Sequence, residues 1–376
     1  MERYFGENTP KLGFGLMRLP RLADGKTIDI DQTSQMVDLF LDAGFTYFDT
    51  AYVYDGSEEA ARKALVDRHP RESYTLATKL NAGIPGLDEA GAKQQFYTSL
   101  ERTGAGYFDY YLLHALGRGN RGKYDEFHLW DFVREQKAKG LIRHCGFSFH
   151  ADPALLEELL TGHPDVDFVQ LQINYADWEN SRVASRECWE IARKHGTSVV
   201  IMEPVKGGTL ANPPKGVREV LQEARPDASF ASWAIRYAAS LDGVITVLSG
   251  MSNLEQVKDN ISYMKDFKPL DASEQAVVRQ AQRVLSESKS IPCTSCRYCT
   301  AGCPKQIPIP EIFGARNLQL IWEQMEKGRQ RYAHAVRDAG KASDCVACGQ
   351  CESACPQHLS VIQYLKDCAE QLERGE

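Results

Sequence analysis

Eight of the eleven cysteines in this 376-residue chain fall into two short runs with the same spacing. The first run is Cys293-x-x-Cys296-x-x-Cys299-x-x-x-Cys303-Pro304, and the second is Cys345-x-x-Cys348-x-x-Cys351-x-x-x-Cys355-Pro356. Thiolate sulfur is the preferred ligand of iron–sulfur clusters, and this spacing lets one loop wrap a corner of a cubane. Zinc also binds cysteine pairs two residues apart, but four cysteines in one tight run closed by proline favour a cluster. The sequence therefore predicts two [4Fe–4S] clusters as cofactors.

The spacing of the two runs resembles that of two-cluster bacterial ferredoxins, in which the fourth cysteine of each run binds the other cluster. By that resemblance, Cys355 joins Cys293, Cys296 and Cys299 at one cluster, and Cys303 joins Cys345, Cys348 and Cys351 at the other. About forty residues separate the runs, more than in a minimal ferredoxin, and Gly314 to Ala339 has a helical pattern. We expect the remaining thiols, Cys145, Cys188 and Cys368, to be buried.

A second set of residues could carry proton transfer to a carbonyl oxygen. Asp49 closes the apolar run FTYFD, Tyr54 follows five residues later, Lys79 closes YTLATK and His114 closes FDYYLLH. A free tyrosine titrates near 10, and a neighbouring ammonium lowers that pKa toward a useful range for an acid. A carboxylate holds the ammonium in place, and a histidine N–H can orient the carbonyl and stabilise its developing charge.

These four residues need a scaffold that brings strand ends together. Amphipathic stretches such as Asp31–Ala43, Ser57–Val66 and Asp125–Lys139 alternate with eight apolar runs, which is typical of a (β/α)8 barrel. A doubly wound open sheet is the alternative, but no G-x-G-x-x-G follows any expected strand. We therefore expect an α/β fold, a (β/α)8 TIM barrel followed by a small, helix-rich, ferredoxin-like iron–sulfur domain. The expected strands are Lys11–Met17, Phe45–Asp49, Tyr74–Lys79, Phe108–His114, Arg143–Ser148, Asp167–Ile173, Ser198–Glu203 and Gly243–Ser249.

The segments GFGLMRLP, FDTAYVYDGSEE, ATK, YYLLH, GFSFH and VVIMEPVKGG together resemble the aldo/keto reductase family, over residues from about 10 to 262. The whole chain is similar to the branch of that family with a C-terminal ferredoxin-like extension. The resemblance implies a barrel that uses NAD(P)H, with Asp49, Tyr54, Lys79 and His114 as its catalytic tetrad. Tyr52 is a competing phenol, but the family's spacing from aspartate to tyrosine selects Tyr54.

The resemblance also implies a cofactor site. Ser148 and Gln172 would bind the nicotinamide carboxamide, and Met202 would pack on the ring where the family commonly has an aromatic side chain. Two positions that carry a lysine and an arginine beside the adenosine 2′-phosphate in NADPH-dependent members are Gly250 and Gln256 here, so both NADPH and NADH remain candidates. The expected cofactor-binding residues are Ser148, Gln172, Met202, Pro204, Val205, Gly207, Gly250, Gln256 and Asn260.

Composition limits the remaining possibilities. A net charge of −7 without a long basic run argues against nucleic-acid binding, and no stretch approaches the ~18 apolar residues of a membrane span. The first residues lack the apolar region of a signal peptide, so we expect a cytoplasmic protein, and exposed clusters suggest an anaerobic or low-oxygen host. The expected domains are a barrel over residues 1–270, a helical linker over 271–290 and an iron–sulfur domain over 291–376.

Three functions are consistent with these features. The first is an NAD(P)H-dependent oxidoreductase that interconverts a small carbonyl and an alcohol, with Tyr54 as the general acid. The second is an electron-transfer protein, partnered by a ferredoxin or another redox protein, whose clusters reduce a substrate bound in the barrel. The third is a redox-sensing subunit without turnover. The sequence does not identify the substrate, and it leaves open whether the clusters feed electrons to the barrel or are structural.

Overall fold

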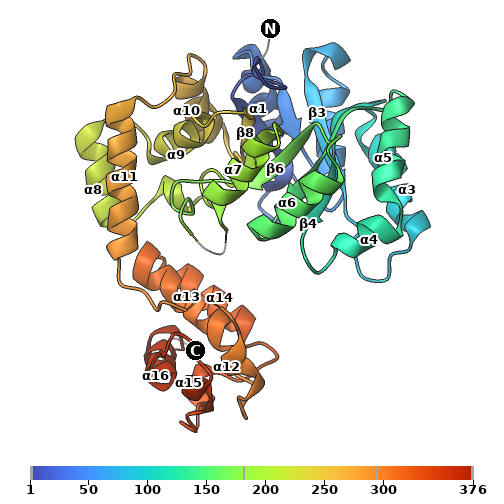
Figure 1. Ribbon diagram of the computed structural model, residues 1–376. Helices are drawn as coiled ribbons and strands as arrows, with labels where there is room; N and C mark the ends of the chain where they lie inside the picture. Colours follow the sequence, from blue (N-terminus) through green and yellow to red (C-terminus); the bar gives the residue numbers. More distant parts are fainter. Residues whose placement is uncertain (1–2, 181–182, 294, 374–376) are drawn as a thin grey trace. The chain divides into compact units, whose positions relative to one another are not determined.

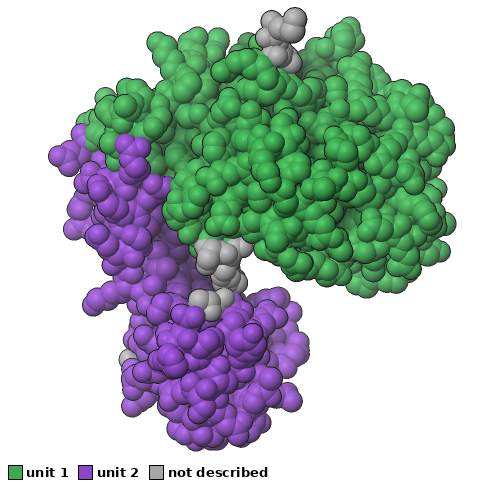
Figure 2. All heavy atoms as spheres, viewed as in Figure 1, with its two compact units in different colours: residues 1–211, 224–278 green, residues 212–223, 279–376 purple. Residues whose placement is uncertain are grey.

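The computed structural model describes residues 3–180, 183–293 and 295–373, and the chain divides into two compact units. Unit 1 comprises residues 1–211 and 224–278, and unit 2 comprises residues 212–223 and 279–376 (Figure 2). The last boundary between them, after residue 278, falls inside helix α11 (Ala272–Glu287). Residues 212–223 group with the cysteine-rich part of the chain, and one contact between them joins Arg218 Nη2 to Glu323 Oε2 at 3.8 Å. No pattern in the sequence predicts this grouping.

Unit 1 is built on eight parallel strands that close into a barrel, with β1 paired to both β2 and β8 (Figure 1). This arrangement confirms the predicted (β/α)8 fold, and each predicted strand overlaps an observed one. The strands are β1 (Leu12–Gly15), β2 (Tyr47–Asp49), β3 (Thr75–Leu80), β4 (Phe108–Leu116), β5 (Ile142–Phe149), β6 (Phe168–Gln172), β7 (Ser198–Met202) and β8 (Val244–Ser249).

Helices connect the strands, and several begin at a side-chain cap. Asp29, Asp88 and Asp152 each accept a hydrogen bond from a backbone N–H in the first turn, which satisfies a donor that the helix itself cannot pair. None of the helices within the described ranges is long and apolar enough to cross a membrane. The helices before α11 are α1 (Ile30–Asp42), α2 (Ser57–Ala61), α3 (Glu89–Thr103), α4 (Arg121–Glu126), α5 (Leu129–Ala138), α6 (Pro153–Gly162), α7 (Ser185–Lys194), α8 (Lys215–Ala224), α9 (Phe230–Ala239) and α10 (Leu254–Met264). All of them belong to unit 1 except α8, which lies in unit 2 up to its last residue.

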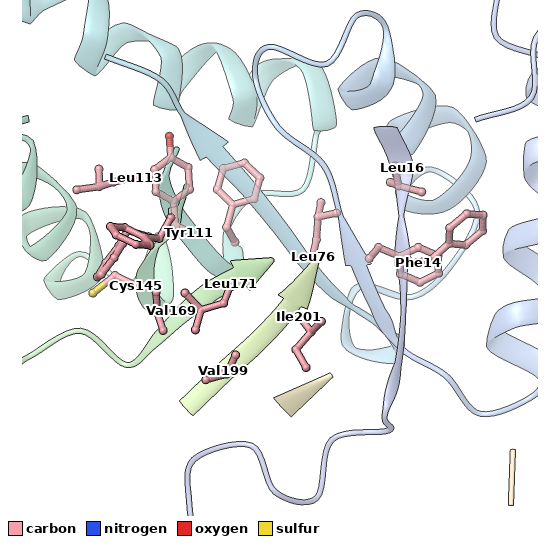
Figure 3. Close-up of a cluster of buried hydrophobic side chains, with 14 of the residues drawn as sticks. Phe14, Leu16, Leu76, Tyr111, Leu113, Cys145, Val169, Leu171, Val199 and Ile201 are labelled. Carbon is pink, nitrogen blue, oxygen red and sulfur yellow. The ribbon is translucent and has the colours of Figure 1, made fainter. Parts of the chain in front are cut away.

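The two faces of the strands enter two separate apolar clusters, because successive side chains of a strand point to opposite sides. Phe48, Tyr111 and Val169 belong to the large cluster shared with the surrounding helices. Tyr111 and Val169 are labelled in Figure 3. Tyr47, Tyr110 and Phe168, one residue earlier in each strand, belong to a smaller cluster. This smaller cluster occupies the opposite strand face, which in a closed barrel is the interior.

Two predicted helices are interrupted, and a third changes its helical geometry part-way. The expected helix over Asp125–Lys139 is two helices, α4 and α5, because His128 adopts a left-handed conformation with φ of 50°. In the same way, Glu323, with φ of 55°, separates α13 (Ile309–Trp322) from α14 (Met325–Ala335) within the expected helical segment Gly314–Ala339. The expected helix Ser57–Val66 begins as α2 and continues as a π-helical segment over Arg62–Val66.

Unit 2 contains a structural repeat that extends beyond the cysteine runs. Helix α12 (Tyr298–Ala301) recurs 52 residues later as α15 (Gln350–Ser353), and α13 begins 52 residues before α16 (Val361–Leu372). Left-handed backbone recurs at the same offset, at Ser295 and Ala347 and at Gln306 and His358. The equal spacing of cysteines, turns and helices indicates two copies of one cysteine-containing loop, each followed by a helix.

Glycine at position 146 permits two barrel strands to approach closely. A Cβ atom built on Gly146 in β5 would lie 2.3 Å from the carbonyl oxygen of Phe168 in β6, a backbone atom that has little room to move. We predict that Gly146→Ala lowers the free energy of unfolding of the barrel by about 1–3 kcal/mol. Urea unfolding followed by tryptophan fluorescence measures this, since four of the five tryptophans lie in residues of unit 1.

The matched control for this prediction is Gly122→Ala in α4, where an added Cβ has nothing within 4 Å. Because alanine favours helix more than glycine does, this control should leave stability unchanged or raise it by up to about 1 kcal/mol. A Gly146→Ala variant as stable as the control would contradict the prediction.

Candidate functional site

Strand geometry brings three of the four predicted tetrad residues together. Asp49 has the same parity as Tyr47 in β2, and His114 has the same parity as Tyr110 in β4, so both point to the barrel interior. Lys79 lies near the end of β3 and pairs in register with Leu112 of β4. Because all eight strands are parallel, these residues meet at the carboxyl end of the barrel, where catalytic groups of this fold are found.

A buried ion pair lies at the centre of the tetrad. The Lys79 ammonium donates to Asp49 Oδ1 at 2.6 Å and to the backbone oxygen of Thr50 at 2.6 Å, and its side chain is fully buried. Burial raises the pKa of the Asp49 carboxyl, and the charge of Lys79 opposes that shift. The two acceptors fix the position of the ammonium beneath the neighbouring aromatic residue.

That residue is Tyr54, in the loop after β2. The Lys79 ammonium lies 5.3 Å from the centre of the Tyr54 ring, and the ring centres of Tyr54 and His114 lie 5.7 Å apart in an edge-to-face arrangement. Burial raises the pKa of Tyr54, while the charge of Lys79 lowers it, so in this structure burial outweighs the ammonium. Tyr52, the competing phenol, instead packs its ring 4.6 Å from the guanidinium of Arg102.

His114 is held in its neutral form. Burial lowers the pKa of this histidine to about 3, and the charges of Lys79 and His150 add to the effect. A neutral imidazole carries one N–H donor and one acceptor nitrogen. Because Nδ1 of His114 is buried without a partner among the described residues, the ring retains hydrogen-bonding capacity for a bound molecule.

A cavity of about 780 Å³ opens beside the tetrad, within the usual range for ligand and cofactor sites. Asp49, Tyr54 and His114 line it, whereas Lys79 lies behind them. Its wall includes seven of the nine predicted cofactor-binding residues: Met202, Pro204, Val205, Gly207, Gly250, Gln256 and Asn260.

Ser148 and Gln172, the other two predicted residues, are not among the residues lining this cavity. The Oγ atom of Ser148 accepts a hydrogen bond from the backbone N–H of Ala115 at 2.7 Å. Gln170, two residues before Gln172 on the same strand face, lines the cavity instead, and its Oε1 atom is buried without a partner among the described residues. Sequence spacing alone cannot distinguish two glutamines that share one strand face.

Other residues that line the cavity were not predicted from the sequence. Met17 and Arg18 follow β1, His150 follows β5, and Phe230 begins α9. Arg18 is the one permanently charged cation among the described lining residues, and its guanidinium lies 3.9 Å from the Glu203 carboxylate. No pattern in the sequence marks these loop positions, because their place depends on how the barrel closes.

The part of the cavity formed by β8 and α10 is polar and partly acidic. Asn253 caps α10 by accepting from the backbone N–H of Gln256, and Glu255 and Asp259 also line this wall. Lys206 could have compensated for the missing cation near Gln256. Its ammonium instead donates to the buried Asp177 carboxylate at 2.5 Å, and Lys206 does not line the cavity.

The cysteines of unit 2 form the second candidate site. Cys293, Cys296 and Cys299 line one cavity together with Cys355 of the second run, and apolar residues such as Ile309 and Phe313 close it. This grouping fits a cluster whose fourth ligand comes from the other run. In the part of the chain that the structure describes, no three His, Cys, Asp or Glu side chains are gathered around a position for a single metal ion.

Two cysteine sulfur atoms in unit 2 accept hydrogen bonds from backbone N–H groups. The N–H of Ser295 donates to Cys293 Sγ at 3.4 Å, and the N–H of Ile307 donates to Cys303 Sγ at 3.5 Å. Hydrogen bonds of this kind tune the reduction potential of a cluster. The three cysteines outside the runs, Cys145, Cys188 and Cys368, are buried as expected.

Two family models match the chain, one over the barrel and one over the cysteine-rich part. A model of the aldo/keto reductase family matches residues 11–283. The chain belongs to the aldo/keto reductase family. A second model, for a 4Fe-4S dicluster domain, matches residues 292–359, which confirms the resemblance to the branch with an iron–sulfur extension. The chain is thus an oxidoreductase with an iron–sulfur domain.

Individual relatives cover the barrel. The uncharacterized oxidoreductase YqkF of Bacillus subtilis is 26% identical over 257 residues, or 60% of this chain and 80% of that protein. An aldo-keto reductase of Mycolicibacterium smegmatis is 29% identical over 212 residues, or 55% of this chain and 69% of that protein.

Solved structures share the fold of the barrel. The holo form of aldo-keto reductase AKR11C1 from Bacillus halodurans has a TM-score of 0.59 at 26% identity, covering 74% of this chain and 95% of that one. An aldo-keto reductase from Klebsiella pneumoniae in complex with NADPH has a TM-score of 0.59 at 22% identity, covering 75% and 96%.

The environment of His114 predicts an unusual pH response. With its pKa lowered to about 3, the ring stays neutral from pH 8 down to pH 5, and its ¹⁵N chemical shifts should not change over that range. Two-dimensional ¹H–¹⁵N NMR of the imidazole measures this, with His114→Gln to assign the signal. Below about pH 6.5 the unfolded chain takes up a proton that the folded chain does not, so His114 should lower stability progressively toward pH 3. An assigned signal that titrates near pH 6.5 would refute this.

Proposed function

We propose that the barrel catalyses the reversible reduction of a carbonyl to an alcohol with NAD(P)H, and that Tyr54 is the general acid. The observation that carries the proposal is the position of Tyr54, next to the buried Lys79–Asp49 pair and to neutral His114, at a cavity of cofactor size. When bound, NAD(P)H supplies the hydride. The residues of the chain supply the proton and the electrostatic environment.

Two observations indicate that the cavity suits a nicotinamide cofactor. The buried, unpartnered Oε1 atom of Gln170 can accept a hydrogen bond from a carboxamide, and Met202 lies beside it, with its sulfur 3.6 Å from Gln170 Nε2. A thioether packs well against an aromatic ring. The Klebsiella pneumoniae reductase, which shares the fold, was solved with NADPH. The proposal includes both NADPH and NADH.

Each member of the tetrad has a distinct part in the proton transfer. As the carbonyl carbon accepts hydride, the Tyr54 hydroxyl donates its proton to the carbonyl oxygen, which becomes the alcohol. The Lys79 ammonium stabilises the phenolate that remains, and Asp49 holds Lys79 in position. Neutral His114 can donate an N–H to the carbonyl oxygen without competing as an acid. In the reverse direction the phenolate accepts the proton.

For unit 2 we propose two [4Fe–4S] clusters with exchanged fourth ligands. Cys293, Cys296, Cys299 and Cys355 would hold one cluster, an assignment that their shared cavity supports. Cys345, Cys348, Cys351 and Cys303 would hold the other, which the 52-residue repeat supports. A role in one-electron transfer is the second candidate function, because this repeat is typical of an electron-carrying module.

Exchange of Tyr54 tests the proposed acid directly. Tyr54→Phe removes the hydroxyl but keeps the ring, and we predict that kcat for carbonyl reduction falls by about 10²–10⁴-fold while the Kd for the nicotinamide cofactor stays within about twofold. Tyr52→Phe is the matched control, since Tyr52 packs on Arg102 and does not line the cavity, and it should retain activity. Equal activity of the two variants would exclude Tyr54 as the acid.

The exchange of ligands between the cysteine runs is tested by paired substitutions. If Cys293 and Cys355 bind the same cluster, Cys293→Ser/Cys355→Ser should lose one cluster and keep about four irons per chain. Cys293→Ser/Cys303→Ser, with the same number of changes, should lose both. Iron analysis and electron paramagnetic resonance of anaerobically purified protein measure this. The opposite pattern, with both clusters lost only in the first variant, would show that each run holds its own cluster.

A further inference from the structure

Helix α14 presents a row of exposed basic side chains, of which Lys327 and Arg331 are the cations. Lys327, Arg331 and His334 are spaced by four and three residues, so they lie on one face of the helix. They line an open groove of about 500 Å³ together with residues of α13, among them Leu318 and Glu311. Within the described ranges, neither Lys327 nor Arg331 has a carboxylate within salt-bridge distance.

This groove adjoins a second one that reaches a predicted cluster ligand. The second groove, of about 540 Å³, is lined by Cys303, Gln306 and Arg297, and Glu311 belongs to the walls of both. Arg297 Nη2 pairs with Glu311 Oε1 at 2.6 Å, which leaves the cations of α14 as the free charges of the combined surface. The row of cations therefore lies next to an opening onto Cys303.

The charge of this surface differs from that of the whole chain. The chain carries a net charge of −7, which disfavours approach of another acidic protein over most of its surface. Residues 325–337 instead contain one acidic and four basic residues: Glu326, Lys327, Arg329, Arg331 and Arg337. Such a local excess of positive charge attracts and orients a negatively charged partner.

We propose that the two grooves form the docking surface for an acidic, one-electron carrier protein. Carboxylates of the carrier would contact Lys327 and Arg331, and its cofactor would face the groove that contains Cys303. A carrier docked there loses one electron, which reduces the cluster ligated through Cys303, and no bond or proton changes place. The inference rests on the proposed clusters of unit 2 and is independent of the hydride chemistry of the barrel.

Charge reversal on α14 tests the docking surface in the holoprotein. The probe is an oxidised plant-type [2Fe–2S] ferredoxin, chosen for its strongly negative surface, and calorimetry measures its Kd at low and moderate salt. We expect Lys327→Glu/Arg331→Glu to weaken binding at least about tenfold at low salt, and we expect the wild-type affinity to fall as salt rises. Lys366→Glu, at an exposed position of α16, is the matched control and should change Kd less than about twofold.

Stopped-flow reduction of the clusters adds a second readout. Reduced ferredoxin should transfer its electron about tenfold more slowly to the double variant than to wild type at subsaturating concentration, while a small neutral donor should reduce both equally. Tyr54→Phe should bind the ferredoxin as wild type does, so failure of the barrel chemistry and failure of docking are distinguishable. Absence of ferredoxin binding to wild type, or equal Kd values for the double variant and the control, would overturn the proposal. A double variant whose clusters change their reduction potential while the Kd for ferredoxin stays the same would also overturn the proposal. In that case Lys327 and Arg331 would only balance the charge of the clusters.

Discussion

The buried contact between the Lys79 ammonium and the Asp49 carboxylate sets the electrostatics of the whole candidate active site. Removal of one member of such a pair commonly costs about 3–5 kcal/mol, because an uncompensated charge is left in a low-dielectric interior. A second contact, from the Lys79 ammonium to the Thr50 carbonyl just after β2, helps to fix the ammonium of this β3 residue in place. From this position the charge of Lys79 opposes the effect of burial on the pKa of Tyr54 and helps to keep His114 neutral. The barrel contributes to this arrangement because its converging strand ends bring Asp49 and His114 close to the Lys79 charge, and the loop after β2 adds Tyr54.

Unit 2 is organised by repetition. Its apolar cluster is small, and cysteines of both runs pack against aliphatic side chains such as Ile309 and Val361, which begin the two repeated helices. A small core of this kind supplies limited stability, so the ligation proposed here would couple folding to cluster binding. The left-handed residues at equal offsets turn each loop around its cysteines. The intervening helix α14 adds to this plan a charged surface without a counterpart in the described part of the second repeat.

Much of the fold and of the candidate site could be predicted from the sequence, because the patterns that reveal them lie within short segments of the chain. Strand positions follow from apolar runs, and strand parity places Asp49 and His114 in the barrel interior. The two helix breaks were missed because His128 and Glu323 adopt left-handed backbone without the glycine that usually marks it. The pairing of Lys206 with Asp177 and the place of Arg18 in the cavity depend on contacts between segments distant in the chain. Such contacts leave no local pattern to detect.

Electron counting limits how the two units could work together. A hydride carries two electrons, whereas a [4Fe–4S] cluster accepts one at a time, so a single cluster could not take over a hydride equivalent. The two clusters proposed for unit 2 would together hold two electrons, and the 52-residue repeat has two loops of matching geometry that could bind them. The tetrad lies entirely in unit 1 and all eight run cysteines lie in unit 2, so each chemistry has its complete set of side chains. A link between them would therefore depend on electron transfer and would not require a shared residue.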